Sequence, residues 1–150
     1  LVKPISANDK KSSFVGSDFA YEDVSGRHWS EDDHSYLRDE PMEGYETTVI
    51  ESKPKQKDYF ARKLSWIDKD SGLVLREEHY DDKDRPLKTF EVLEIAEVDG
   101  YKTAVKRRMT TPRKDNVTIV EFGEVAFDLG LEEDIFTERY LKSPPREYVQ

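Results

Sequence analysis

The densest group of potential metal ligands in the sequence is a short stretch in which two histidines bracket three carboxylates. Its members are His28, Glu31, Asp32, Asp33 and His34. Imidazole nitrogens and carboxylate oxygens both coordinate divalent cations, but this spacing matches no metal motif. The alternative, which we favour, is a solvated acidic loop whose carboxylates cap one helical turn.

A second acidic stretch, at residues 81–84, reads DDKD and has the carboxylate density of a calcium loop. The EF-hand loop requires a glycine at its sixth position, whereas the sixth residue counted from Asp81 is Pro86. The calcium motif is therefore not met. We expect neither a metal nor any other cofactor.

The sequence offers no recognisable arrangement for nucleophilic catalysis. It has no cysteine, and it contains neither a Gly-x-Ser-x-Gly elbow nor a phosphate-binding loop. His79 falls in a predicted strand, where we expect it to be a half-buried packing residue. Because 33 residues are Asp or Glu, close carboxylate pairs arise by chance. We therefore expect no enzymatic activity.

Composition excludes several classes of function. The 150 residues carry 24 Lys and Arg against 33 Asp and Glu, a net charge of −9, which opposes binding to nucleic acid. No window approaches the roughly 18 apolar residues of a transmembrane segment. Eight Tyr, seven Phe and two Trp supply large apolar groups that a disordered acidic chain lacks. We expect one folded domain over residues 1–150.

From residue 55 onward, alternating residues between turn signals are typical of an antiparallel meander. The predicted strands cover residues 59–67, 73–80, 87–98, 101–111 and 117–127, with shorter strands at 34–37 and 45–51. The Asp99-Gly100 pair is a strong hairpin signal. The last strand has apolar residues on both faces, so we expect it to be central or covered.

Helical periodicity is almost absent, and only single turns are predicted near residues 30–33 and 132–136. We expect residues 1–33 to be largely loop, residues 34–141 to form an antiparallel sheet and residues 142–150 to form a tail. The predicted fold class is mainly β. A sheet with so little helix leaves apolar surface uncovered, where a hydrophobic ligand can lie.

Residues 12–23 read SSFVGSDFAYED and resemble the signature of the bacterial outer-membrane lipoprotein-sorting family, relatives of the periplasmic lipoprotein carrier with the LolA-like fold. Further blocks are similar to that family in type, order and spacing: WIDK at 66–69, EHYD at 78–81, LKT at 87–89, and DIFT at 134–137 with YL at 140–141. Family members are longer. The resemblance implies that this chain is the C-terminal portion of a protein whose precursor has a signal peptide.

The resemblance implies a curved, incompletely closed antiparallel sheet, or half-barrel, enclosing a hydrophobic cavity. It also implies a noncatalytic periplasmic carrier for lipoprotein acyl chains or another hydrophobic ligand, acting in lipoprotein sorting or envelope lipid transport. The alternative function is a protein-interaction module that docks to an envelope or exporter complex.

Two sets of residues are candidates for the site. Strand alternation places apolar residues on a ligand-facing surface, with ordinary core packing as the alternative: Phe60, Leu64, Trp66, Val105 and Met109. The family signature supplies the second set, to which we assign a structural role in preference to ligand binding: Gly16, Ser17, Asp18, Phe19, Tyr21, Glu22 and Asp23. Its glycine suits a tight turn, its carboxylates suit capping of backbone N–H groups, and its aromatic residues anchor the segment.

Overall fold

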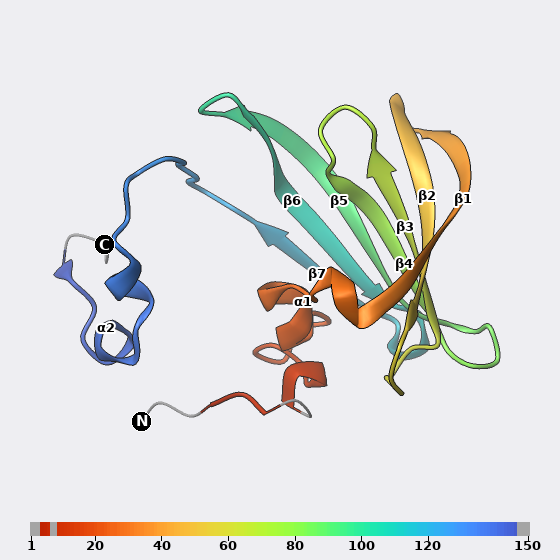
Figure 1. Ribbon diagram of the computed structural model, residues 1–150, viewed down its shortest axis with the longest axis horizontal. Helices are drawn as coiled ribbons and strands as arrows, with labels where there is room; N and C mark the ends of the chain where they lie inside the picture. The colour runs from red at the N-terminus through yellow and green to blue at the C-terminus, as the bar shows by residue number, and fades with distance from the viewer. Residues whose placement is uncertain (1–3, 7–8, 147–150) are drawn as a thin grey trace.

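A computed structural model describes residues 4–6 and 9–146 and consists mainly of one antiparallel sheet (Figure 1). Its strands lie side by side in chain order. They are β1 (Asp32–Met42), β2 (Tyr45–Pro54), β3 (Arg62–Asp68), β4 (Val74–Tyr80), β5 (Pro86–Val98), β6 (Tyr101–Thr111) and β7 (Asn116–Glu121). β1 and β7 form the two edges, so the sheet is open. The predicted fold class, an incompletely closed antiparallel sheet with little helix, is confirmed.

Local turn chemistry explains the short connections between strands. Asp99 and Gly100 have φ values of 50° and 85°, the two positive values of a type I′ hairpin turn, and they join β5 to β6. A 3₁₀ turn, η3 (Pro112–Lys114), joins β6 to β7. Every predicted strand is present, but β3 begins at Arg62 rather than at residue 59.

The last strand differs from its prediction. The sequence predicts a central or covered strand over residues 117–127, whereas β7 ends at Glu121 and forms an edge. Val117 and Ile119 are 57% and 54% exposed. Apolar residues on both faces do not by themselves supply a neighbouring strand, and within the described residues none follows β7 to cover it. Beyond β7 the chain stays beside the β5–β6 hairpin without forming a strand: the Phe122 N–H donates to the Val105 carbonyl at 2.9 Å, and the Phe127 N–H donates to the Asp99 carboxylate at 2.9 Å.

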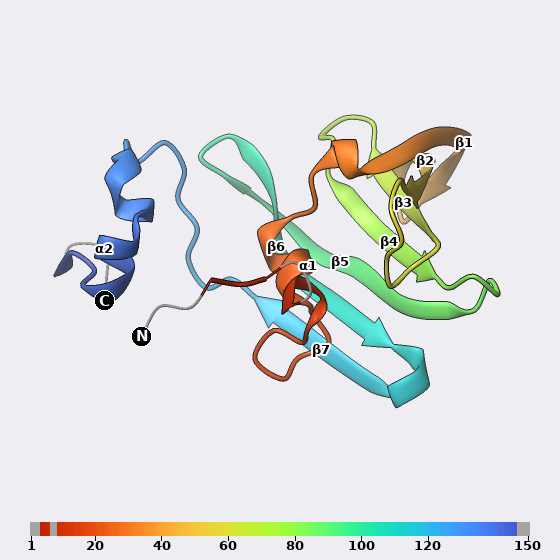
Figure 2. The same cartoon turned by 60° about the horizontal axis from the view of Figure 1, so that its bottom comes forward.

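One face of the sheet, which we call the inner face, is partly covered by the N-terminal segment. This segment contains the turns η1 (Asp9–Lys11) and η2 (Trp29–Glu31) and the short helix α1 (Tyr21–Ser25). Figure 2 shows α1 over the part of the sheet formed by β5, β6 and β7. Because side chains alternate between faces along a strand, the inner face takes one half of each strand's residues.

The opposite, outer face is covered by its own charged side chains. Trp66 is buried, with the guanidinium carbon of Arg76 5.5 Å from its ring centroid. Arg62 lies over Tyr80 in the same way, at 4.1 Å. Glu78 accepts hydrogen bonds from Arg76, at 2.9 Å, and from the Tyr80 hydroxyl. The long side chains therefore shield the outer aromatic rings without a covering helix.

The C-terminal part of the chain lies apart from the sheet in both views (Figures 1 and 2). It contains the turn η4 (Glu133–Phe136) and the short helix α2 (Glu138–Lys142). Several of its large apolar residues are exposed: Leu129, Leu131, Phe136 and Leu141. In the described parts of the chain, no helix has the length and apolar character needed to cross a membrane.

Candidate functional site

The inner face and the N-terminal segment enclose a cavity of about 240 Å³. Its apolar walls are formed by Phe19, Phe60, Val74, Phe90 and Met109. Its other walls carry ionisable side chains: Glu22, Asp23, Arg27, Tyr59, Lys63, Glu77, His79 and Arg107. Sites for drug-sized ligands occupy roughly 300–1,000 Å³, so this cavity alone is small for a long acyl chain.

The signature segment, residues 12–23, folds back on itself beside this cavity. The Ser17 hydroxyl donates to the Phe14 carbonyl at 2.6 Å, and Gly16 lies in the turn between them with a φ of 76°. Phe19 is buried and lines the cavity. Tyr21 packs edge to face against Phe14, with 5.4 Å between ring centroids. These contacts fix the shape of the segment.

Two sets of polar contacts attach the signature segment to the sheet. The Asp18 backbone N–H donates to the Thr118 hydroxyl at 3.0 Å, and that hydroxyl donates to the Asp18 carboxylate at 2.7 Å. The Lys88 ammonium lies 2.6 Å from both carboxylate oxygens of Asp23. Asp23 also accepts from the Ala20 N–H at 2.7 Å and so caps α1. The start of α1 is thereby tied to β5 and β7.

A chain of polar contacts crosses the inner face below α1. The Tyr59 hydroxyl lies 3.0 Å from His79 Nδ1, and His79 Nε2 lies 3.0 Å from Glu77 Oε1. Glu77 also accepts from Ser65 at 3.2 Å and pairs with Lys63 at 3.1 Å. All contacts are satisfied when His79 is neutral, donates from Nε2 and accepts the Tyr59 proton at Nδ1.

Burial and these contacts set the protonation states. Burial lowers the pKa of His79, which favours the neutral ring. Burial also raises the pKa of Tyr59, so the phenol stays protonated and donates. Burial alone would raise the pKa of Glu77, but His79 and Lys63 outweigh it and hold the pKa at about 2. At neutral pH each proton in this chain of contacts is therefore engaged in a hydrogen bond.

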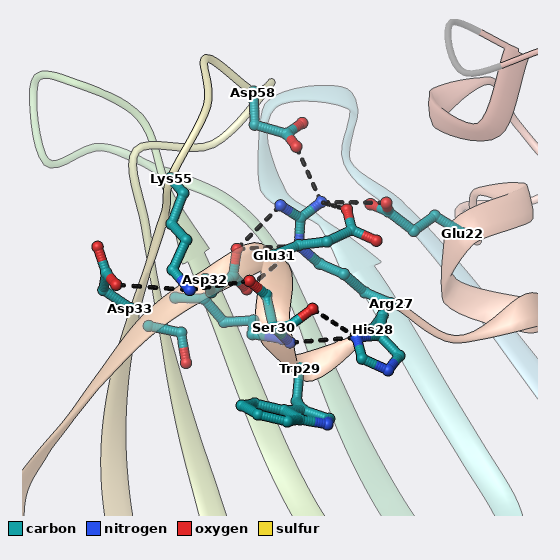
Figure 3. Close-up of polar contacts among 12 residues, drawn as sticks. Glu22, Arg27, His28, Trp29, Ser30, Glu31, Asp32, Asp33, Lys55 and Asp58 are labelled. Carbon is teal, nitrogen blue, oxygen red and sulfur yellow. Dashed lines mark hydrogen bonds and ion pairs between the residues drawn. The ribbon is translucent and has the colours of Figure 1, made fainter.

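Arg27, one of the residues lining the cavity, joins three segments of the chain (Figure 3). Its guanidinium group donates to Asp32 at the start of β1, with distances of 2.9–3.2 Å. It also contacts Glu22 of α1 at 3.1 Å and Asp58 before β3 at 2.9 Å. Burial opposes the charge, but the carboxylates, Asp32 foremost, outweigh it and raise the pKa of Arg27. The cluster holds α1, β1 and the loop before β3 together.

The residues considered as metal ligands are engaged in other contacts. Asp32 pairs with Arg27, and His28 Nδ1 lies 2.7 Å from the Ser30 hydroxyl (Figure 3). The His34 ring nitrogens lie 2.8 Å from the Ser52 hydroxyl and 2.7 Å from a backbone carbonyl. Across residues 4–6 and 9–146, no three histidine or acidic side chains are arranged to hold a metal ion.

A second, more open hollow of about 720 Å³ lies where β5, β6 and the chain after β7 meet. We call it the apolar groove, because Glu124 is its one charged lining residue. The other lining residues are Ala96, Val98, Val105, Phe122, Gly123, Val125 and Ala126. Arg107 lines the cavity, and its guanidinium carbon lies 4.9 Å from the ring centroid of Phe122 in the groove. Arg107 therefore lies between the cavity and the groove.

The structure does not bring the five predicted ligand-facing residues together. Phe60 and Met109 line the cavity, and Val105 lines the apolar groove. Leu64 and Trp66 pair with outer-face residues of β4. The expectation that residues 60, 64 and 66 share one face is corrected, because Phe60 precedes β3 and the alternation does not extend to it.

Sequence reasoning did not single out Arg27, Lys88 or Arg107. Arg107 had a detectable signal, because it stands between Val105 and Met109 on the apolar side of an alternating strand. Arg27 and Lys88 had none, since their partners lie as far as 31 and 65 residues away in the sequence.

Comparison with known proteins agrees with this architecture. A family model described as "Uncharacterized protein" matches residues 1–143. The chain belongs to this family. No curated protein matches it.

Three solved structures are similar to the chain. A DUF1329 family protein from Desulfovibrio piger is 29% identical, with a TM-score of 0.83 over 94% of this chain. A crystal structure described as an outer membrane lipoprotein-sorting protein domain, from Vibrio parahaemolyticus, is 32% identical, with a TM-score of 0.83 over 92%. A LolA superfamily protein from Nitrosomonas europaea is 18% identical, with a TM-score of 0.68 over 87%.

These neighbours confirm the resemblance to lipoprotein-sorting proteins and the LolA-like fold of this chain. In each case the chain spans 60% of the length of the solved structure. The remaining 40% of each neighbour has no counterpart in this chain.

Proposed function

We propose that this chain belongs to a noncatalytic periplasmic protein that binds and carries the acyl chains of lipoproteins or another hydrophobic ligand. It would act in lipoprotein sorting or envelope lipid transport. The observation that carries the proposal is the apolar groove beside the cavity on an otherwise polar sheet. Moving an acyl chain through water requires burial worth about 0.8 kcal/mol per methylene. The lipoprotein-sorting and LolA neighbours support the same function.

A noncatalytic role is supported by the chemistry of the cavity. Its most buried ionisable groups, Tyr59, His79 and Glu77, are bonded to one another. Burial raises the pKa of Tyr59 and lowers that of His79, which favours the protonated phenol and the neutral imidazole, while contacts with His79 and Lys63 lower the pKa of Glu77 and favour its charged form. A satisfied network of this kind makes the cavity floor rigid.

Whether the apolar groove binds the acyl chain can be tested by filling the groove with a larger side chain. In the full-length protein, Val105→Trp should place a large ring among the groove residues and weaken binding of a fluorescent fatty acid by about tenfold or more. Val117→Trp is the matched control, because Val117 is 57% exposed and pairs with Thr110 on the opposite face. Mass spectrometry of extracts from the purified protein should recover acyl species. No acyl species and no fatty acid binding would contradict the proposal.

A second candidate function is docking to an envelope or exporter complex. Leu129, Phe136 and Leu141 are 64%, 78% and 70% exposed in the segment that lies apart from the sheet. Exposed apolar residues of this kind mark interaction surfaces. If docking is the function, Phe136→Ser with Leu141→Ser should abolish association with the complex and leave fatty acid binding unchanged. If this segment is not a docking surface, the double variant should match the wild type in both association and fatty acid binding.

A further inference from the structure

Arg107 is placed unlike the other cations near the cavity. Arg27 pairs with Asp32, Lys63 with Glu77 and Lys88 with Asp23. For Arg107, in contrast, no carboxylate of the described chain lies within the 4.0 Å that defines an ion pair. The hydrogen bond found for its side chain runs from Nε to the Ala104 carbonyl, at 3.2 Å.

Apolar groups flank this guanidinium group, and the carboxylates of the same cavity, Glu22, Asp23 and Glu77, pair with other cations. The guanidinium group lies over the Phe122 ring on the groove side and shares the cavity lining with Met109 and Phe90. Burial lowers the pKa of Arg107, which is the direction expected for a cation that loses water and gains no anion. A guanidinium group retains its charge in proteins, so the site holds a positive charge that has no acidic partner among the described residues, 4–6 and 9–146.

We infer that Arg107 binds the anionic head group, a carboxylate or a phosphate, of an amphiphile whose hydrocarbon chain lies in the apolar groove. This inference rests on the proposed function and specifies its ligand class. The guanidinium group presents parallel N–H donors that match the oxygens of either anion. The groove walls beside it, including Val105, Phe122 and Val125, supply apolar surface for the chain.

The charge distribution around the groove agrees with this orientation. Glu124 is the one acidic residue of the groove lining, and its side chain is exposed. Its repulsion of an anionic head group is therefore screened by solvent, whereas the attraction to half-buried Arg107 is screened less. Pairing at Arg107 fixes which end of the ligand lies beside the cavity, and the apolar contacts then determine how well the chain fits.

The test compares ligands that differ only in the head group. Isothermal titration of the full-length protein with tetradecanoic acid, tetradecyl phosphate and tetradecanol separates head-group from chain recognition, with the two anions kept below their micelle concentrations and the alcohol below its solubility limit. We expect the wild type to bind at least one anionic ligand about tenfold or more tighter than the alcohol. A preference for the acid indicates a fatty acid source, and a preference for the phosphate indicates a phospholipid source.

The matched variants are Arg107→Gln and Arg108→Gln. Arg108 is the next residue, faces the other side of β6 and pairs with Glu91 at 2.7 Å, so its loss removes the same charge outside the site. Arg107→Gln should abolish the anionic preference and leave alcohol affinity unchanged, whereas Arg108→Gln should retain the preference. Arg107→Met serves as a second variant if the first folds poorly.

Each other result overturns a specific claim. Equal affinities of wild type for acid, phosphate and alcohol, or a preference that survives Arg107→Gln, would remove Arg107 from the site while the carrier function stands. If wild type binds none of the three ligands, the carrier proposal fails as well, and the head-group site fails with it.

Discussion

The ammonium group of Lys88 lies 2.6 Å from both carboxylate oxygens of Asp23, across a sequence separation of 65 residues. Both side chains are largely buried, with exposures of 9% and 14%. The pair joins β5 to α1, the helix that covers the cavity. The attachment of α1 to the inner face therefore depends on an ion pair in which both side chains are largely buried.

Asp23→Asn should destabilise the protein by about 3–5 kcal/mol, because it leaves the Lys88 charge buried without a partner. Adding Lys88→Met should recover part of that loss, since no charge is then buried. Urea denaturation measures both effects. The control is Glu138→Gln, which breaks an exposed pair with Lys142 and should change the midpoint little. An Asp23→Asn midpoint equal to wild type would show that water replaces the carboxylate.

Acid should destabilise the fold through Glu77. Its pKa is held at about 2 in the folded protein, below the ordinary 4.5. A depressed carboxyl pKa contributes stability that is complete above pH 4.5 and is lost as the pH falls towards 2. The shift corresponds to about 3 kcal/mol. His79, whose pKa is lowered by burial, adds a separate loss that begins below its usual value of about 6.5.

The measurement is the urea midpoint of wild type and Glu77→Gln between pH 2 and 6. The variant should be less stable than wild type at pH 6 and should lose less stability between pH 4.5 and 2. Parallel curves for the two proteins over that window would contradict the assignment of the acid effect to Glu77.

Arg27→Lys should not be a conservative change. The guanidinium group reaches Asp32, Glu22 and Asp58 at 2.9–3.1 Å, and a lysine ammonium cannot match this planar set of donors. We expect a loss of about 2 kcal/mol or more by urea denaturation. Arg38→Lys is the control, because its pair with Glu40 is exposed, and it should leave the midpoint nearly unchanged. Equal effects of the two substitutions would count against a clamp at Arg27.

The strands could be predicted because their signals are local. Alternation defines β4, β5 and β6 to within one residue, and Asp99-Gly100 defines the turn between two of them. The cover over the inner face could not be predicted, since it depends on pairs such as Asp18 with Thr118, which are 100 residues apart. The alternation of residues within one segment does not indicate which distant residue a side chain will contact.

The candidate site could be predicted only in part. Met109 and Val105 lie on the inner face as alternation along β6 requires. Phe60 also reaches the cavity, but from the loop before β3 rather than from within the strand. β3 starts three residues later than predicted. Phe60 therefore lies outside the strand and on the inner side of the sheet, whereas Trp66 lies on the outer face. One-residue accuracy at strand ends decides the face of every side chain, and sequence patterns do not provide it.

Trp66 provides the last prediction, because it reports on the outer face. Its indole N–H lies 3.3 Å from Glu40, Arg76 lies over its ring, and only 6% of the residue is exposed. Trp29, the other tryptophan, is 73% exposed, so Trp29→Phe isolates the Trp66 signal. In that background, Trp66 fluorescence should not change when tetradecanoic acid is added, even where displacement of a fluorescent fatty acid shows that the acid binds.

Trp66→Ala should cost about 3–5 kcal/mol of stability, because it removes a large ring beneath Arg76. Trp66→Phe retains most of the volume and should leave fatty acid affinity at the wild-type value. A ligand-dependent shift in Trp66 emission, together with weaker fatty acid binding by Trp66→Phe, would instead place the acyl chain on the outer face. That face carries charged residues in ion pairs, whose desolvation opposes acyl binding, and this is why we expect the inner face to hold the ligand.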